Sequence, residues 1–212
     1  EISQRIFGVG TLVLGLLLGG FGLARRQKER ALEQRVAEAS RLLQQADPQS
    51  RARGTLILDE VLASDPDHRA SLLLRASSRV AQGDWRGAEA DLTRGVELDP
   101  QAADARLQRA RVRYDAGRTS AAMEDLDALL NREPDHVEAL LLRGEARLEA
   151  GDRARAETDF KDARRASRTP AQVLAAECRL ARLIEDLDRQ WNRYRDELIA
   201  QESVDRRVPT GT

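Results

Sequence analysis

A unit of about 34 residues is repeated between residues 69 and 168, and this repetition constrains the fold more than any other feature of the chain. Gly83, Gly117 and Gly151 are spaced by 34 residues. The same spacing separates the members of four further sets: Pro66, Pro100 and Pro134; Ala88, Ala122 and Ala156; Asp91, Asp125 and Asp159; Leu92, Leu126 and Phe160. Such a period indicates units that stack along one axis and share a continuous core.

Each unit has the pattern of two helices joined by a turn. In the first half, apolar residues such as Leu73, Ala76 and Val80 recur at helical spacing. The glycine that follows favours the left-handed conformation that ends a helix, and a second apolar helix comes after it. A proline then disfavours helix in the residue before it, so each unit ends where the next begins.

The repeat resembles the tetratricopeptide repeat. The matching stretches are LLLRASSRVAQGDWRGAEADLTRGVELDP at 72–100, LQRARVRYDAGRTSAAMEDLDALLNREP at 107–134 and LLLRGEARLEAGDRARAETDF at 140–160. The resemblance implies an all-α, right-handed superhelix of helix pairs with a concave protein-binding surface. A fold alone does not fix a function, so the cargo does not follow from the resemblance.

Residues 6–24, IFGVGTLVLGLLLGGFGLA, are 19 consecutive residues without a charge. As a helix they would be roughly 28 Å long, close to the thickness of a bilayer, so we predict a transmembrane helix. Gly15 and Gly19 have the spacing that lets membrane helices pack closely, although glycine is also common in such helices. A cleaved signal peptide is the competing interpretation, with Gly22 and Ala24 as a cleavage site.

Basic residues follow this span more often than they precede it. Arg25, Arg26, Lys28, Arg30 and Arg35 come after it, and only one basic residue comes before it. The positive-inside rule then places the repeats in the cytoplasm, with the span in a bacterial inner membrane. Residues upstream of position 1 could reverse this orientation, so a periplasmic body remains an alternative.

The first and last repeats depart from the pattern, as terminal repeats do. In the first, Gln49 stands where glycine is expected, and Asp47 and Pro48 supply the turn instead. After the third full repeat, Pro170 comes two residues later than the period requires. A long helix is predicted from about residue 171 to about residue 202, with one apolar stripe: Leu180, Leu183, Leu187, Trp191, Tyr194 and Leu198.

The predicted fold is all-α: a transmembrane helix, a solenoid of about three and a half helix pairs and a capping helix. The order is an anchor (1–24), a basic juxtamembrane helix (25–34), a degenerate first repeat (35–68), three full repeats (69–102, 103–136 and 137–168), a C-terminal capping helix (169–203) and a tail (204–212).

No catalytic or metal-binding pattern is visible in the sequence. His68 and His136 occupy the same position in two repeats, which favours a structural, solvent-facing role, and the single cysteine excludes a cysteine-based zinc site. A formal net charge of -1 gives no reason to expect nucleic acid. We therefore predict a protein that is not an enzyme and needs no cofactor or metal.

Two arginines four residues apart recur in every full repeat, and they have two interpretations. The pairs are Arg75 and Arg79, Arg109 and Arg113, and Arg143 and Arg147. Like charges on one helix face repel, so a partner is needed. The structural interpretation pairs them with the repeated aspartates of the second helices, and it is favoured over an electropositive stripe that receives an acidic peptide.

An apolar stripe along the first helices is the second candidate surface. Most of it is expected to pack between helices, but an exposed part would line a peptide-binding groove. The candidate partner-binding residues are those of this stripe and of the last helix: Leu73, Leu107, Arg111, Tyr114, Leu141, Glu145, Trp191, Tyr194 and Leu198.

The function predicted from these features is a membrane-anchored scaffold or adaptor that binds other proteins, including a membrane protein. The alternative is an accessory subunit of a larger membrane complex, docked through the glycine-rich span and the last helix. The layout resembles that of membrane-anchored lipopolysaccharide assembly proteins, but one cysteine cannot form their paired-cysteine metal module.

Overall fold

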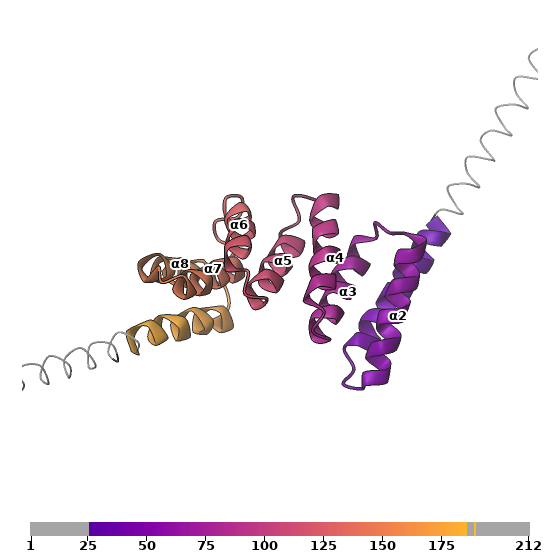
Figure 1. Cartoon of the computed structure of the whole chain (residues 1–212), viewed down its shortest axis with the longest axis horizontal. Helices are drawn as coiled ribbons and strands as arrows, with labels where there is room; N and C mark the ends of the chain where they lie inside the picture. The colour runs from indigo at the N-terminus through magenta and orange to yellow at the C-terminus, as the bar shows by residue number, and fades with distance from the viewer. Residues whose placement is uncertain (1–25, 186–188, 190–212) are drawn as a thin grey trace, which may run out of the picture. The chain divides into compact units, whose positions relative to one another are not determined.

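The computed structural model describes residues 26–185 and 189, and every regular element among them is an α-helix (Figure 1). The chain divides into two compact units at the boundary between Ala105 and Arg106. The first unit holds a helix over residues 26–43, α2 (Pro48–Ser64), α3 (Arg69–Ala81) and α4 (Trp85–Leu98). The second holds most of α5 (Ala103–Asp115), then α6 (Thr119–Leu130), α7 (Val137–Glu149), α8 (Arg153–Ala166) and a C-terminal helix over residues 170–185.

The repeated glycines end the first helices, as the sequence predicts. Gly83, Gly117 and Gly151 have φ values of 79°, 74° and 81°, in the left-handed region that side chains with a Cβ disfavour. Around Gly83 the turn is closed by two hydrogen bonds, in which the Gly83 N–H donates to the Val80 carbonyl and the Asp84 N–H to the Arg79 carbonyl. The helix pairs predicted from the period are therefore present.

The two histidines begin helices. Nδ1 of His68 accepts a hydrogen bond from the Ser71 N–H at 3.3 Å, and Nδ1 of His136 accepts one from the Ala139 N–H at 3.3 Å. Each thus satisfies a backbone donor that the first turn leaves without a partner. Their predicted structural role is confirmed, although they are half-buried caps rather than fully solvent-facing side chains.

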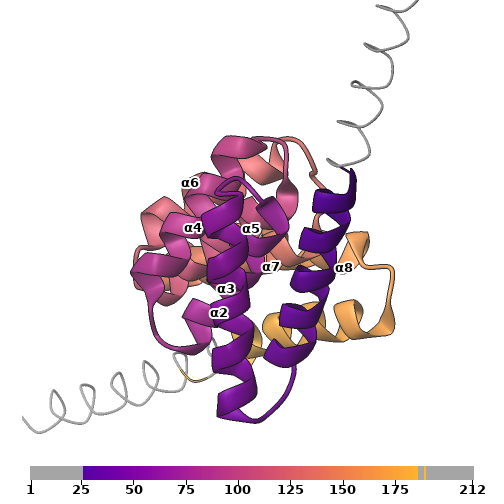
Figure 2. The ribbon, with the colours of Figure 1, turned by 90° about the vertical axis from the view of Figure 1, so that its right-hand side faces the viewer.

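The first helix pair has an early turn and a long second helix. Asp47 caps α2 by accepting the Ser50 N–H at 2.8 Å, so the turn lies where predicted, but Pro48, expected in the turn, is already the first helical residue. The helix α2 has 17 residues and α4 has 14, so α2 begins about one turn earlier than the period requires. The helix over residues 26–43 lies beside α2 (Figures 1 and 2), close enough that a Cβ on Gly54 would be 3.0 Å from the Ala39 carbonyl oxygen.

A different pair of side chains fills the same core position in different repeats. In the first unit Ala76 and Leu92, both buried, occupy that position on α3 and α4. The equivalent residues on α7 and α8 are Gly144 and Phe160, and a Cβ on Gly144 would lie 2.3 Å from the Phe160 ring. The missing methyl group of Gly144 therefore makes room for the larger ring.

The C-terminal helix covers the last helix pair, as predicted from its apolar stripe. Ala176 and Leu183 are buried on its inner side. Arg179 of this helix donates to Glu145 of α7 at 2.6 Å, and Arg153 of α8 donates to the Leu183 carbonyl at 2.5 Å. This part of the chain therefore belongs to the second unit.

Several predicted features lie outside the described residues. These are the span at residues 6–24 with Gly15 and Gly19, and the aromatic end of the last helix with Trp191, Tyr194 and Leu198. Among the helices that the structure does describe, none combines the length and the apolar character needed to cross a membrane.

Candidate functional site

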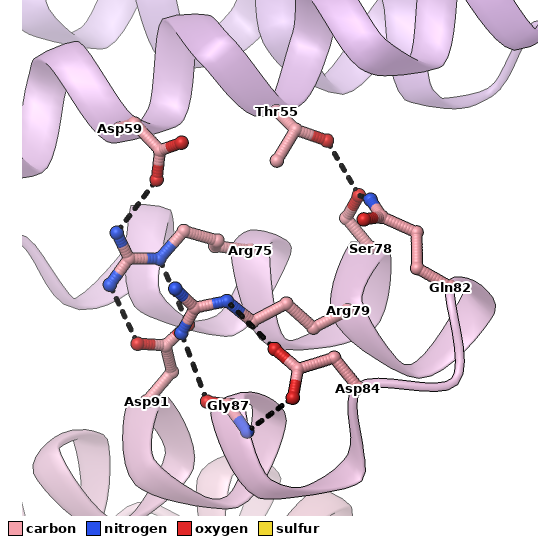
Figure 3. A network of polar contacts seen from close by, with 9 residues as sticks. All are labelled: Thr55, Asp59, Arg75, Ser78, Arg79, Gln82, Asp84, Gly87 and Asp91. Carbon is pink, nitrogen blue, oxygen red and sulfur yellow. Dashed lines mark hydrogen bonds and ion pairs between the residues drawn. The ribbon is translucent and has the colours of Figure 1, made fainter.

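The repeated arginines and aspartates form a buried ladder of ion pairs. In the first unit, Arg75 of α3 donates two hydrogen bonds to Asp91 of α4, from Nε to Oδ2 at 2.9 Å and from Nη2 to Oδ1 at 2.7 Å (Figure 3). Arg79, one turn further along α3, adds a bond from Nη1 to Asp91 Oδ2 at 2.7 Å. The hydrogen bonding of Arg75 to the Asp91 carboxylate raises the pKa of Arg75, so the guanidinium stays charged.

The second unit repeats this arrangement twice. Asp125 of α6 accepts from Arg109 at 2.9 and 2.6 Å and from Arg113 at 3.0 Å. Asp159 of α8 accepts from Arg143 at 3.2 and 2.8 Å and from Arg147 at 2.6 Å. The structural interpretation of the arginine pairs is confirmed, because these guanidinium groups are engaged by carboxylates inside the fold and are not free to receive an acidic peptide.

Two of the arginines also bind a carboxylate of the preceding helix. Arg75 Nη1 donates to Asp59 of α2 at 2.8 Å, and Arg143 Nη1 donates to Asp127 of α6 at 2.8 Å. Sequence reasoning missed both aspartates. They are two repeat periods apart, and the residue midway between them is Thr93, so the signal was interrupted. These two arginines therefore join three successive helices.

The predicted apolar stripe is partly buried. Leu73 is half-buried and packs against the cluster of Val96, Ala102 and Ala105. Leu107 is also half-buried, and Leu141 is only 8% exposed. The stripe is therefore buried at Leu141 and keeps some exposed apolar surface at Leu73 and Leu107.

The polar candidates on the same face are placed differently from one another. Arg111 is exposed on α5. Glu145 is half-buried, and its Oε1 accepts from Nε of Arg179 on the C-terminal helix at 2.6 Å. Tyr114 is half-buried, and burial first, then the charges of Glu149 and Glu145, raises the pKa of its hydroxyl. Tyr114 and Glu145 thus share one environment on the second unit.

We expect Tyr114 to titrate above the ordinary tyrosine value of 10.0. The folded state holds this proton more tightly than the unfolded state. The resulting stability is therefore complete below pH 10 and is lost as the pH rises through the higher folded pKa. The chain has two tyrosines, so a Tyr194→Phe variant leaves Tyr114 as the only one to be followed by absorbance. A midpoint at or below 10 would contradict this placement.

A groove that sequence reasoning did not identify lies in the first unit. It has a volume of about 650 Å³ and is lined by the end of the helix over residues 26–43, by α2 and by α3. Its apolar lining includes Leu43, Ala52, Leu56, Leu74 and Ala81, and its polar lining includes Ser40, Thr55, Ser77, Ser78 and Gln82. Leu56 is 59% exposed, so the groove offers an apolar surface to solvent.

The polar lining of the groove is held in place by hydrogen bonds. Thr55 and Ser78 share a hydrogen bond of 2.7 Å between their hydroxyl oxygens, and Gln82 donates to Ser78 at 3.1 Å (Figure 3). The early start of α2, directly after the turn predicted at Asp47 and Pro48, contributes to this surface.

Within the described residues, no group of histidine, cysteine, aspartate and glutamate is arranged to hold a metal ion. Residues 79–144, from α3 to α7, match the sequence profile of the family described as Tetratricopeptide repeat. Residues 79–144 are tetratricopeptide repeats. The resemblance seen in the turn glycines, the small residues at the helix crossings and the prolines is thereby confirmed. No curated protein sequence matches the chain.

Solved structures share the tetratricopeptide fold. A crystal structure of MamA protein is 18% identical, with a TM-score of 0.57, over 66% of this chain and 75% of that chain. A MamA RS-1 ArsTM double mutant is 13% identical, with a TM-score of 0.57, over 74% and 96%. The first tetratricopeptide domain of Spaghetti (RPAP3), bound to an HSP90 peptide, is 18% identical, with a TM-score of 0.52, over 58% and 96%. At these identities the similarity is one of fold.

Proposed function

We propose that this protein is a non-enzymatic, membrane-anchored adaptor whose tetratricopeptide repeats hold a partner protein at a bacterial inner membrane. The groove of the first unit is the observation that carries this proposal, because it presents exposed apolar surface within a rigid helical frame. Tetratricopeptide folds serve protein binding, and the RPAP3 domain of the same fold is solved with a bound peptide.

The chemistry of the groove favours a peptide with apolar side chains. Leu56 and Leu74 supply the apolar surface, and hydroxyl and amide groups of Thr55, Ser77 and Gln82 can bond a peptide backbone. Asp59 at one edge is already bonded to Arg75. The groove therefore suits an amphipathic helix or an extended apolar segment.

The membrane part of the proposal rests on the sequence. Residues 6–24 are long and apolar enough to span a bilayer, and basic residues cluster after them. Of those basic residues, Arg26, Lys28 and Arg30 lie at the start of the helix over residues 26–43 and are exposed. We place the repeats in the cytoplasm, with a periplasmic body as the alternative.

The test is copurification in mild detergent from native membranes. The full chain, a chain without residues 1–24 and a Leu56→Glu variant are compared, with Ala154→Glu as the control, since Ala154 is an exposed apolar residue of α8 outside every proposed binding surface. We expect the Leu56→Glu variant to recover at least about ten-fold less partner than the full chain, because a charge in an apolar contact is costly to desolvate. Loss of residues 1–24 should release the chain from the membrane fraction.

Two results would contradict the proposal. Partner recovery that is unchanged in Leu56→Glu would show that the groove is not the binding surface. A chain without residues 1–24 that still sediments with membranes, in the absence of its partner, would show that these residues are not the anchor. Leu56 is exposed, so the substitution should leave the fold intact.

A second candidate function is an accessory subunit of a larger membrane complex, docked through the span and the last helix. Leu174 and Ile184, both 61% exposed on the C-terminal helix, favour it. Partners retained only by chains that contain residues 1–24 would support this function over the adaptor.

A further inference from the structure

The C-terminal helix occupies the position of a first helix in a further repeat. Two of its residues bond the residues that precede them by one full period. Nε2 of Gln172 donates to Glu138 at 3.2 Å, and Nε of Arg179 donates to Glu145 at 2.6 Å, each across 34 positions. Each residue of the helix can therefore be compared with the residue 34 positions earlier on α7.

In the inner repeats, two positions of the first helix are covered by the second helix of the same pair. At the first position Leu72 and Leu140 are each 3% exposed, and the middle repeat has Arg106, which is half-buried and lies 3.6 Å from Asp125 of α6. At the second, Ala76 and Ala110 are buried, as is Gly144 beneath Phe160. The equivalent residues of the C-terminal helix are Leu174, which is 61% exposed, and Cys178, which is also exposed. We call Leu174, Cys178 and the adjacent exposed Ala181 the uncovered face.

The described part of the chain does not turn back to cover this face. The inner repeats turn at glycines, and the residue one period after Gly151 is Glu185. The carboxylate of Glu185 pairs with Arg189 one turn later at 3.5 Å, and residue 189 is helical. Residue 185 is thus still helical at the place where each inner repeat has its turn glycine.

The charge at the centre of this surface is opposite to that of the inner repeats. Where Arg75, Arg109 and Arg143 bind a buried aspartate of the second helix, the C-terminal helix has Glu177, which is exposed. A second helix with aspartate at the usual place would set two carboxylates against each other, which is unfavourable in a buried contact. A helix with arginine or lysine there would instead form an ion pair.

We propose that the uncovered face binds an amphipathic helix of a partner protein, which packs as the missing second helix of this repeat. The partner helix carries a basic residue opposite Glu177 and a large apolar residue opposite Cys178, as Leu92 lies opposite Ala76 in the first unit. The glutamate selects against the chain's own second helices, which carry Asp91, Asp125 and Asp159, so a second copy is disfavoured. This surface belongs to the second unit, and its test does not depend on the groove.

The test uses a synthetic helix as the probe. The α4 sequence Trp85–Leu98 is prepared as a helix-stabilised, fluorescent peptide with the substitution Asp91→Arg, beside the unsubstituted peptide. Binding to the full chain in detergent is followed by fluorescence anisotropy, and protection of Cys178, the only cysteine of the chain, by its rate of alkylation. We expect the substituted peptide to bind about ten-fold tighter or more, because a buried charge pair replaces a repulsion.

Reversing the charge at position 177 distinguishes specific recognition of the peptide from general electrostatic attraction. Glu177→Arg in the chain should reverse the preference, so that the Asp91 peptide binds tighter. Glu157→Arg, an exposed glutamate on α8, should leave the preference unchanged. Both peptides should slow alkylation of Cys178 in proportion to their occupancy.

Each other outcome overturns the proposal. Equal or absent binding of the two peptides, or a preference that Glu177→Arg does not reverse, would exclude the proposed helix. If Cys178 is alkylated slowly without peptide, and more slowly as the protein concentration rises, the face is covered by a second copy. Protection that does not depend on concentration would assign it to the chain's own residues beyond 189.

Discussion

Replacing Gly144 by alanine is expected to lower the free energy of unfolding of the second unit by about 2 to 3 kcal/mol. The added methyl group would lie 2.3 Å from the Phe160 ring, and both residues are buried against one another in α7 and α8. The helix gains from alanine only about 1 kcal/mol, so the clash outweighs the gain. Urea unfolding followed by circular dichroism would measure the change.

A second substitution should repair the first. Phe160→Leu together with Gly144→Ala recreates the Ala76 and Leu92 pair that the first unit uses at the same position. We expect the double variant to be more stable than Gly144→Ala alone, although Phe160→Leu alone leaves a cavity and costs about 1 kcal/mol. Destabilisation that is simply additive would show that the two side chains do not compete for the same space.

Gly95 offers a matched control for the glycine substitution. It is also buried in a helix, but a Cβ there would be 3.6 Å from its nearest neighbour, the Ala105 side chain, which is an ordinary contact. Gly95→Ala should therefore be neutral or raise the free energy of unfolding by up to about 1 kcal/mol, through helix propensity.

Replacing Asp159 by asparagine is expected to cost about 3 kcal/mol or more. The Asp159 side chain is 2% exposed and accepts from both Arg143 and Arg147, so its loss leaves two guanidinium groups close together without the charge that balances them. Asparagine has nearly the same shape, so the effect reports the charge and the lost acceptor rather than a cavity. The same unfolding measurement applies.

Asp127 provides the comparison for Asp159. It also binds Arg143, at 2.8 Å, but its side chain is 49% exposed. Solvent screens such a pair, so Asp127→Asn should cost no more than about 1 kcal/mol. Equal effects of the two substitutions would show that burial does not set the strength of the ladder.

The sequence was most informative where the repeat period applies. The turn glycines, the helix pairs and the binding of Asp91, Asp125 and Asp159 to the arginine pairs could all be predicted, because each feature occurs three times at one spacing. A chance pattern does not recur in step, and each recurrence places a residue on the same helix face.

Features that occur once, or that skip a repeat, could not be predicted in this way. Asp59 and Asp127 are separated by Thr93, which hides their common role. The groove depends on the extra turn of α2, which starts at Pro48 in a repeat without the turn glycine. Gly144 and Phe160 occupy the positions that the repeat period predicts. That the smaller residue makes room for the larger one is visible only in the structure, where the two are in contact.

The candidate site was predicted less well than the fold, because helical spacing shows which residues share a face but not what lies over that face. Leu141 belongs to the apolar stripe and is buried, whereas Leu56 was not singled out and is exposed. Glu145 was predicted as a partner contact, and within the chain it binds Arg179. The exposure of each side chain depends on the neighbouring helix, which only tertiary structure provides.

The forked contact of Arg75 has a mechanical consequence for a tethered protein. Its guanidinium holds Asp59 on α2 and Asp91 on α4 at once, so α2 cannot move away from α3 without breaking an ion pair. If residues 6–24 are the anchor, a pull on the membrane end is transmitted through this contact to the next helix pair. The Asp59 side chain is 49% exposed, so dissolved salt should weaken its ion pair with Arg75. Less force on the membrane end should then be needed to separate α2 from α3.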